Sequence, residues 1–233
     1  MNSGFYKDLD TNFEQAFEMS ARTFSHSELL EMLQNGNIPQ KQLAALRLEG
    51  VNNQAEADIL VSDLTGCDGK IREAVSLKIS NLLREEPECI KFFNQAETFA
   101  DATIDINANI CRLVVDFVPI LKQNQDFTQV YLEKILGFIE NSFVELDKIA
   151  FRDKKYVINK QLFKLYWCLE TLKNFVEDIE QEKLLAILER SCQETEYTIR
   201  EKVAQIAVKT GFEELKNQLK KDDNYYVRAV FVS

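Results

Sequence analysis

The chain is poor in the residues that break helices, since its 233 residues include only seven glycines and three prolines. Sheet proteins need frequent turns, and turns draw heavily on Gly and Pro. No segment shows the alternation of apolar and polar residues that a half-buried strand requires. The scarcity of both residues therefore favours long helices with short connections, and the sequence predicts an all-α fold.

Histidine and clustered cysteine are also nearly absent. The single histidine, His26, lies between two serines at a predicted helix start, which is an ordinary surface position. The five cysteines include no CxxC pair, so the spacing typical of zinc ligands is missing. The chain also has neither a glycine-rich phosphate loop nor a nucleophile elbow. We therefore predict a protein that is not an enzyme, with no catalytic residue, metal site or cofactor.

Positive charge is in the minority, with 28 Lys and Arg against 38 Asp and Glu and a net charge of −10. This balance opposes a generic nucleic-acid partner, because phosphate binding relies on clustered cations. No apolar run approaches the roughly 18 residues of a membrane span, and residues 1–10 resemble no signal peptide. Dispersed cysteines are typical of reduced, buried thiols. These features predict a cytoplasmic protein with no membrane partner.

Caps and apolar spacing predict where the helices lie. Thr11-x-x-Glu14 and Ser25-x-x-Glu28 are capping-box patterns, and Gly36 is a typical residue just past a helix end. Pro39 suits the first turn of a helix. The predicted helices are 12–24, 26–35, 39–50, 53–64, 70–84, 88–101, 105–122, 127–150, 154–177, 181–193, 196–210, a short helix after Gly211, and 224–233.

A short phrase recurs along the chain. Asp68-Gly69-Lys70-Ile71-Arg72 returns in outline at 196–200 and at 223–228, each time as an acid, a turn, and a β-branched residue followed by Arg. The apolar residues that anchor the phrase and its weaker copies are Ile71, Ile110, Ile158, Ile199 and Val227, separated by 39, 48, 41 and 28 residues. Repetition at such periods predicts stacked helical hairpins.

The phrase resembles HEAT and HEAT-like repeats, including the short repeats of phycobilisome-lyase type. The segments that carry the resemblance are 68–84, 195–210, 222–232, 107–122, 154–177 and, without its Arg, 39–50. The strict period and Trp-Leu-Gly pattern of tetratricopeptide repeats are missing. The resemblance implies an α-solenoid (α-α superhelix) of about five to six antiparallel hairpins. Residues 1–233 would form one domain, with capping helices at about 11–36 and repeats at about 39–233.

The same resemblance implies a structural role for the motif. In such arrays the turn acid and the Arg form a ladder that bonds across adjacent repeats, and the planar guanidinium suits this because it donates to carboxylates and carbonyls together. The expected ladder residues are Asp68, Arg72, Glu196, Arg200, Asp223 and Arg228.

The repeat register also predicts a binding surface. In the resembling family the second helix of each hairpin lines a concave groove. On helix 70–84 the apolar stripe leaves Ser76 and Ser80 for this groove, and the corresponding positions of helix 154–177 hold Phe163 and Trp167. An aromatic pair beside cations is typical of an anchor for a peptide or helix of a protein partner. The predicted binding residues are Phe163, Trp167, Lys160, Lys164, Arg112 and Val115.

Several alternatives stay open. Phe163 and Trp167 would also suit the interior, and the basic run 147–164 would suit a solvated face. The scaffold function competes with a DNA-glycosylase-like enzyme, which net charge and a single Trp oppose, and with a bilin-lyase-like protein, which rests on fold analogy alone. The apolar end of helix 224–233 adds the hypothesis of a homodimer through that helix.

Overall fold

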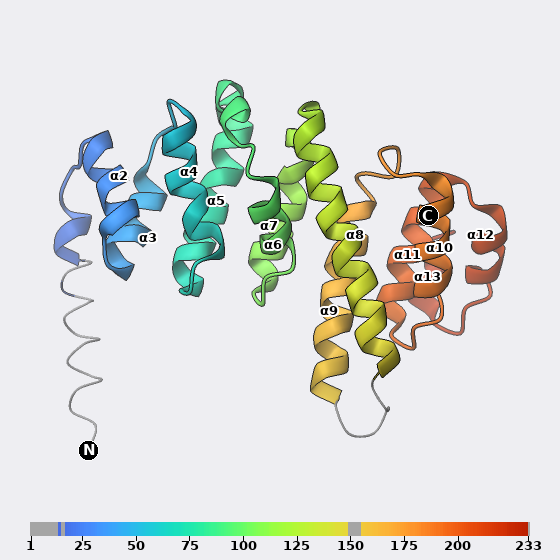
Figure 1. Ribbon diagram of the computed structural model, residues 1–233. Helices are drawn as coiled ribbons and strands as arrows, with labels where there is room; N and C mark the ends of the chain where they lie inside the picture. The colour runs from blue at the N-terminus through green and yellow to red at the C-terminus, as the bar shows by residue number, and fades with distance from the viewer. Residues whose placement is uncertain (1–13, 15–16, 149–154, 233) are drawn as a thin grey trace, which may run out of the picture. The chain divides into compact units, whose positions relative to one another are not determined.

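The computed structural model describes residue 14 and residues 17–148 and 155–232, which form helices and no strand (Figure 1). The prediction of an all-α chain is confirmed. The Thr11-x-x-Glu14 capping box and most of the predicted helix 12–24 lie outside the described residues, although residues 17–20 are helical. Among the helices described, none combines the length and the apolarity that crossing a membrane demands. The chain divides into two compact units, Met1–Phe127 and Thr128–Ser233, called here the N-terminal and C-terminal units.

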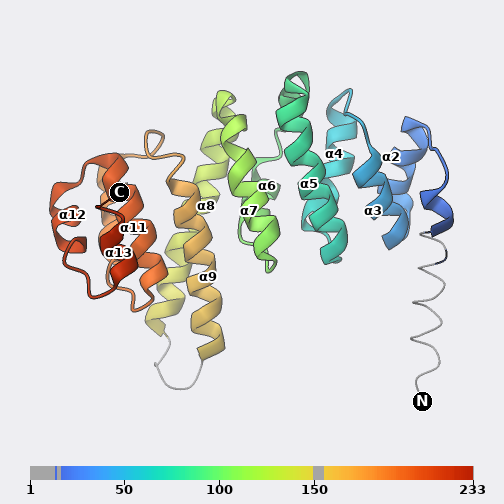
Figure 2. The same cartoon turned by 180° about the vertical axis from the view of Figure 1, so that it is seen from behind.

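The N-terminal unit contains paired helices in two layers (Figures 1 and 2). The second helix of each pair packs on the second helix of the next, so α3, α5 and α7 form one layer, and α2, α4 and α6 form the other. The elements are α2 (His26–Asn35), α3 (Ile38–Arg47), α4 (Gln54–Ser62), η1 (Asp63–Thr65), α5 (Gly69–Glu85), η2 (Pro87–Phe92), α6 (Ala96–Thr103), α7 (Ala108–Phe117) and η3 (Val118–Gln123).

Local caps explain where these helices begin and end. Ser25 and Glu28 form the predicted capping box, in which the Ser25 amide donates to Glu28 Oε2 at 2.7 Å. Asn37 caps α3 in the same way. At Gly36 a Cβ would lie 2.3 Å from the Met32 carbonyl oxygen, so the sharp exit from α2 needs glycine. The sequence therefore fixes these helix ends through a few side chains.

Two predicted helices of this unit are shorter in the structure. The segment predicted as one helix at 88–101 is divided into η2 and α6, with residues 93–95 outside any helix. The helix predicted at 105–122 is α-helical only to Phe117, and it continues as the 3₁₀ segment η3. Pro119 explains this change because proline has no N–H to donate to the preceding turn.

The C-terminal unit is organised around one helix. α11 packs against α9 and α13 on its flanks and against α10 and α12. Gly211, with φ of 74°, ends α11 in the left-handed conformation that glycine adopts without strain. The elements are α8 (Gln125–Lys148), which begins just before the boundary, α9 (Lys155–Leu172), α10 (Gln181–Ser191), α11 (Tyr197–Thr210), α12 (Glu213–Leu219) and α13 (Tyr225–Ala229).

Aromatic side chains fill much of the interior. In the N-terminal unit the buried Phe99 ring contacts Phe93, Phe117 and Phe127, with ring centroids 5.6–6.5 Å apart. In the C-terminal unit the Tyr131 and Phe175 rings are buried against each other at 5.7 Å. Tilted and edge contacts of this kind add to the hydrophobic stabilisation of each core.

Candidate functional site

Arg72 of α5 joins its helix to the turn before α7. Its Nε and Nη2 donate to the two carboxylate oxygens of Asp105 at 2.7 and 3.2 Å. Its Nη1 donates to the carbonyl oxygens of Gly66 and Cys67 at 2.8 and 3.2 Å. Both charged side chains are more than nine-tenths buried. One guanidinium therefore bonds both the turn before its own helix, α5, and the turn before α7.

Arg200 of α11 repeats this geometry in the C-terminal unit. Its Nε and Nη2 donate to the Asp222 oxygens at 2.7 and 3.1 Å, and its Nη1 donates to the carbonyls of Glu194 and Thr195 at 2.8 and 2.9 Å. The hydrogen bonds from Arg200 outweigh burial and hold the pKa of the Asp222 carboxyl below its usual range. The recurring phrase thus corresponds to a recurring three-dimensional link.

The linking cation lies four residues after the residue that caps its helix. Lys41 has the same position in α3, and its Nζ donates to both Asp63 oxygens at 2.8 and 3.0 Å. The segment 39–50 therefore has a related ion pair made by Lys, although its acid stands five residues before the next cap, Asp68. The four caps with their cations are Asn37 with Lys41, Asp68 with Arg72, Glu196 with Arg200, and Asn224 with Arg228.

The acidic residues that pair with Arg72 and Arg200 are not the ones predicted from the sequence. Asp68 accepts from the Lys70 and Ile71 amides, and Glu196 accepts from the Thr198 amide, so both carboxylates cap their own helices. Asp223 accepts from Arg228 only through its backbone carbonyl. The carboxylates that pair with arginine are Asp105 and Asp222, each two residues before the next cap. Among the described residues, none of the three expected acids bonds an arginine side chain through its carboxylate.

The predicted binding residues fall in both units. Arg112 and Val115 lie on α7 of the N-terminal unit, and the other four lie on α9 of the C-terminal unit. Arg112 and Lys160 are exposed, and Lys164 and Phe163 are half-buried. Val115 is buried.

Trp167 belongs to the interior, with 7% of its surface exposed. Its ring meets those of Phe163 and Tyr166 edge-on at 6.3 and 5.1 Å. Its indole N–H is buried without a hydrogen-bond partner in the described part of the chain. The burial favours the alternative in which Trp167 fills core.

Ser76 and Ser80 of α5 are buried, whereas the sequence predicts that they line an open groove. Sequence periodicity identified one apolar stripe on α5 and left the serines for an open groove. α5 packs against α3 on one flank and α7 on the other, so a second face of the helix is covered as well. A helix in the middle of a layer buries residues beyond its apolar stripe.

Fluorescence of Trp167 will report this burial directly, because it is the only tryptophan. We expect iodide to quench the folded chain several-fold less than the urea-unfolded chain, since the ring is shielded from the anion. Similar quenching in both states would show that Trp167 is exposed on the surface and contradict its burial. Free N-acetyl-tryptophanamide in the same buffers corrects for the effect of urea on quenching.

A partly buried polar cluster joins α9 to α11. Glu170 Oε2 lies 2.7 Å from Lys202 Nζ, and Glu170 Oε1 lies 2.5 Å from Lys173 Nζ. Lys202 is only 8% exposed, and its Nζ lies 5.0 Å from the centre of the Tyr166 ring. Burial alone would raise the pKa of the Glu170 carboxyl, but its ion pairs with Lys173 and Lys202 hold that pKa below its usual range. The ion pair between Glu170 and Lys202 therefore links α9 to α11.

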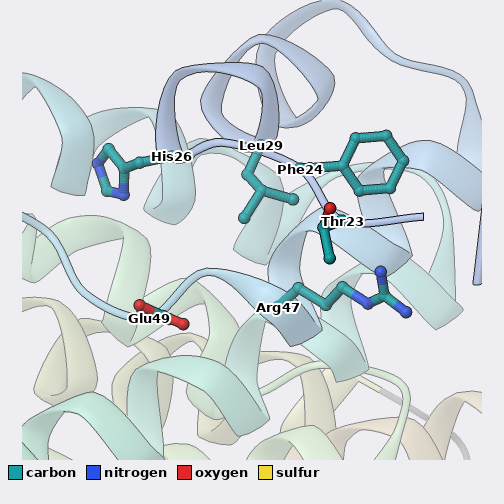
Figure 3. A pocket seen from close by; sticks show the side chains of 6 residues that line it. All are labelled: Thr23, Phe24, His26, Leu29, Arg47 and Glu49. Carbon is teal, nitrogen blue, oxygen red and sulfur yellow. The ribbon is translucent and has the colours of Figure 1, made fainter.

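A cavity of about 280 Å³ lies near the start of the described chain (Figure 3). Two of its polar side chains, His26 and Arg47, already have structural partners. His26 Nε2 lies 2.9 Å from Glu56 Oε2, and the Arg47 guanidinium donates to the carbonyls of Ser20 and Arg22 at 2.5 Å. The cavity is lined by Thr23, Phe24, His26, Leu29, Arg47 and Glu49.

The cysteines are all free thiols, and Cys67 alone of the five is exposed. Burial raises the pKa of the Cys111 and Cys192 thiols to about 12, so both are protonated at neutral pH. Within the described residues no group of three or more His, Cys, Asp or Glu side chains is arranged to hold a metal ion.

Comparison with known proteins gives a likeness of fold. No protein-family model and no curated protein matches the chain. A crystal structure of an engineered protein is similar over 89% of this chain and 96% of its own, at 14% identity and a TM-score of 0.53. A second engineered protein covers 89% of this chain and 94% of its own, at 13% identity and a TM-score of 0.46. At 14% identity the first likeness concerns the fold alone.

Proposed function

We propose that this chain is a HEAT-like α-solenoid that works as a non-catalytic scaffold, binding a peptide or helix of another protein on its second helices. The recurrence of one cation–carboxylate link supports the repeat architecture, because it joins successive pairs in both units. The three links are Lys41–Asp63, Arg72–Asp105 and Arg200–Asp222. Free thiols at the cysteines support a reducing compartment, and we propose the cytoplasm.

Two exposed leucines carry the binding proposal. Leu46 of α3 is 48% exposed and Leu77 of α5 is 41% exposed. Each lies nine residues after the cap of its helix, and α3 packs on α5 (Figure 2). A single exposed leucine is common on protein surfaces. Two at the same register of adjoining helices place apolar side chains at matching points of one layer, which suits the apolar face of a bound helix.

Charged residues lie one turn before the leucine position on α5, and both at that turn and at the leucine position on α7. α5 contributes Glu73, and α7 contributes the exposed Arg112 and Asp116. Asn109 donates to Glu73 Oε1 at 3.3 Å, which connects α7 to α5 at this level. An apolar centre with polar surroundings is the usual composition of a binding interface. We therefore propose an amphipathic partner with apolar anchors on the leucines.

The double substitution Leu46→Asp/Leu77→Asp tests this surface. Helical peptides selected from a displayed library on the wild-type chain should bind the double variant at least about tenfold more weakly in calorimetry. The folded state should keep its stability because both leucines are half exposed.

Val144→Asp is the matched control, since Val144 is 50% exposed on α8 of the C-terminal unit, outside the proposed surface. It should leave peptide affinity unchanged. Equal affinity of the selected peptides for wild type and for the double leucine variant would contradict the proposal.

A further inference from the structure

A single asparagine of the sequence, Asn35, is followed by glycine. Asn35 is the exposed last residue of α2, and Gly36 leads from α2 to Asn37, the cap of α3. Every other asparagine precedes a residue with a side chain. An asparagine next to glycine is prone to attack by the following backbone nitrogen, because glycine has no Cβ to hinder the approach and rotates freely. The side-chain amide of Asn35 is therefore the most labile of the asparagine amides.

The fold requires this glycine. A Cβ at position 36 would collide with the Met32 carbonyl oxygen and with the Gln40 Cβ. α2 packs directly on α3, and only Gly36 and Asn37 connect the two helices, so the connection has little room to adjust. The reactive pair is therefore part of the helix connection itself.

Two hydrogen bonds hold the pair in an unreactive geometry. The Gly36 N–H donates to the Met32 carbonyl at 2.9 Å, and Asn35 Nδ2 donates to Glu31 Oε1 at 2.8 Å. Asn35 also has a helical backbone. A ring between the Asn35 side chain and the next backbone nitrogen closes only after Asn35 leaves the helical conformation and Gly36 releases Met32. The reaction is therefore restricted to molecules in which the last turn of α2 is open.

We propose that Asn35 is a site of spontaneous deamidation whose rate is set by opening of the last turn of α2. In the open turn the Gly36 backbone nitrogen attacks Cγ of Asn35 and loses its proton to the solvent. The side-chain nitrogen takes a proton from the solvent and leaves as ammonia. Water then opens the resulting succinimide at one of its two carbonyls, which gives aspartate or isoaspartate. Helix ends open locally at low free-energy cost, so the reaction proceeds in the folded chain.

Neither product closes the turn as asparagine does. An aspartate at position 35 has its carboxylate four residues after Glu31, where the two negative charges repel, and at the negative end of the helix dipole. Isoaspartate adds a methylene group to the backbone and moves the Gly36 N–H away from Met32. Each product therefore weakens the hydrogen bond that slowed its formation. The site includes neither leucine of the peptide-binding surface, so the proposal does not depend on peptide binding.

The Gly36 amide measures the opening directly. Hydrogen exchange of this amide, followed by ¹⁵N NMR of the full chain, reports the fraction of molecules in which its bond to Met32 is broken. Peptide mapping by mass spectrometry measures deamidation of Asn35 in the folded chain and in urea, at the same pH and temperature. We expect the folded chain to deamidate at least about tenfold more slowly, by a factor that follows the exchange protection. Equal rates in both states, or an Asn35 that stays intact for much longer than this protection predicts, would refute the proposal.

Variants at position 35 separate the reaction from its consequence. Asn35→Gln keeps an amide but needs a larger ring that forms more slowly, so deamidation at this position should nearly stop in urea. Asn35→Asp represents the aspartate product, and we expect the exchange protection of its Gly36 amide to fall several-fold. Asn35→Asp/Glu31→Gln should recover much of that protection, because one of the two charges is removed. Protection in Asn35→Asp equal to that of wild type would contradict the weakening of the turn by its own product.

Discussion

Replacing Arg72 with methionine should lower the free energy of unfolding of the N-terminal unit by about 3–5 kcal/mol, the usual cost of breaking a buried ion pair on one side. The change leaves the Asp105 carboxylate, which is 8% exposed, without its cation. Only the Asn107 amide at 2.7 Å and local dipoles would then face that charge. The carbonyls of Gly66 and Cys67 also lose their donor.

Arg228→Met is a matched control for this experiment. Arg228 lies at the same distance from its cap and bonds two carbonyls at the same offsets, but among the described residues no carboxylate forms an ion pair with it. Its loss should cost about 1 kcal/mol, the net value of ordinary hydrogen bonds. Urea unfolding followed by circular dichroism, with hydrogen exchange to localise the effect, measures both variants. Arg72→Met/Asp105→Leu should recover much of the loss. Equal costs for Arg72→Met and Arg228→Met would contradict the role of Asp105.

Replacing Glu170 with leucine should destabilise the C-terminal unit by about 3 kcal/mol at pH 7. The variant leaves the Lys202 ammonium, which is 8% exposed, without a carboxylate at 2.7 Å. The acceptor left for it is Gln205 Oε1 at 3.3 Å. A double change, Glu170→Leu/Lys202→Leu, should cost less than the single change because it leaves no buried charge unpaired. A single variant as stable as wild type would show that the cluster does not hold α9 to α11.

The same cluster makes stability depend on acid. The pKa of the Glu170 carboxyl is lower in the folded chain than in the unfolded one, where it lies at about 4.3. A depressed folded pKa contributes stability above the unfolded value, and this contribution disappears as the pH falls through the folded value. Glu170→Gln lacks this contribution, so its difference in stability from wild type should shrink between about pH 5 and pH 3. Urea unfolding across this range, with the exposed Glu182→Gln as control, measures the effect.

Helices with complete local signals were predicted well from the sequence. α2 and α5 each have a polar cap followed by apolar residues at helical spacing, and both lie within one residue of their predicted bounds. Local signals were insufficient at 88–101, where the predicted helix is divided, and at Pro119, which changes the helix type. At those places the pattern of apolar residues continues while the backbone hydrogen bonding changes.

The candidate sites depended on distant contacts and were harder to predict. The position of Arg72 follows from its own helix, but its acid, Asp105, is 33 residues away and belongs to the next turn. Burial of Trp167 likewise depends on packing that no local pattern records. The exposed residues Leu46 and Leu77 could have been identified from the sequence. Each is apolar, lies outside the buried stripe of its helix and stands nine residues after the cap. Comparison of cap-relative positions would have found them.

In α7, the position of the linking cation holds Cys111, whose Sγ donates to the Asp105 carbonyl at 3.0 Å. A thiol has one hydrogen to give, so it can complete its own turn but has no second donor for the following one. The series that begins at Lys41 therefore stops at α7, and the boundary between the two compact units follows soon after, at Phe127. The consequence concerns which part of the chain these links stabilise. The Lys41 and Arg72 links both lie within the N-terminal unit, and α7 has no cation at this position to extend them.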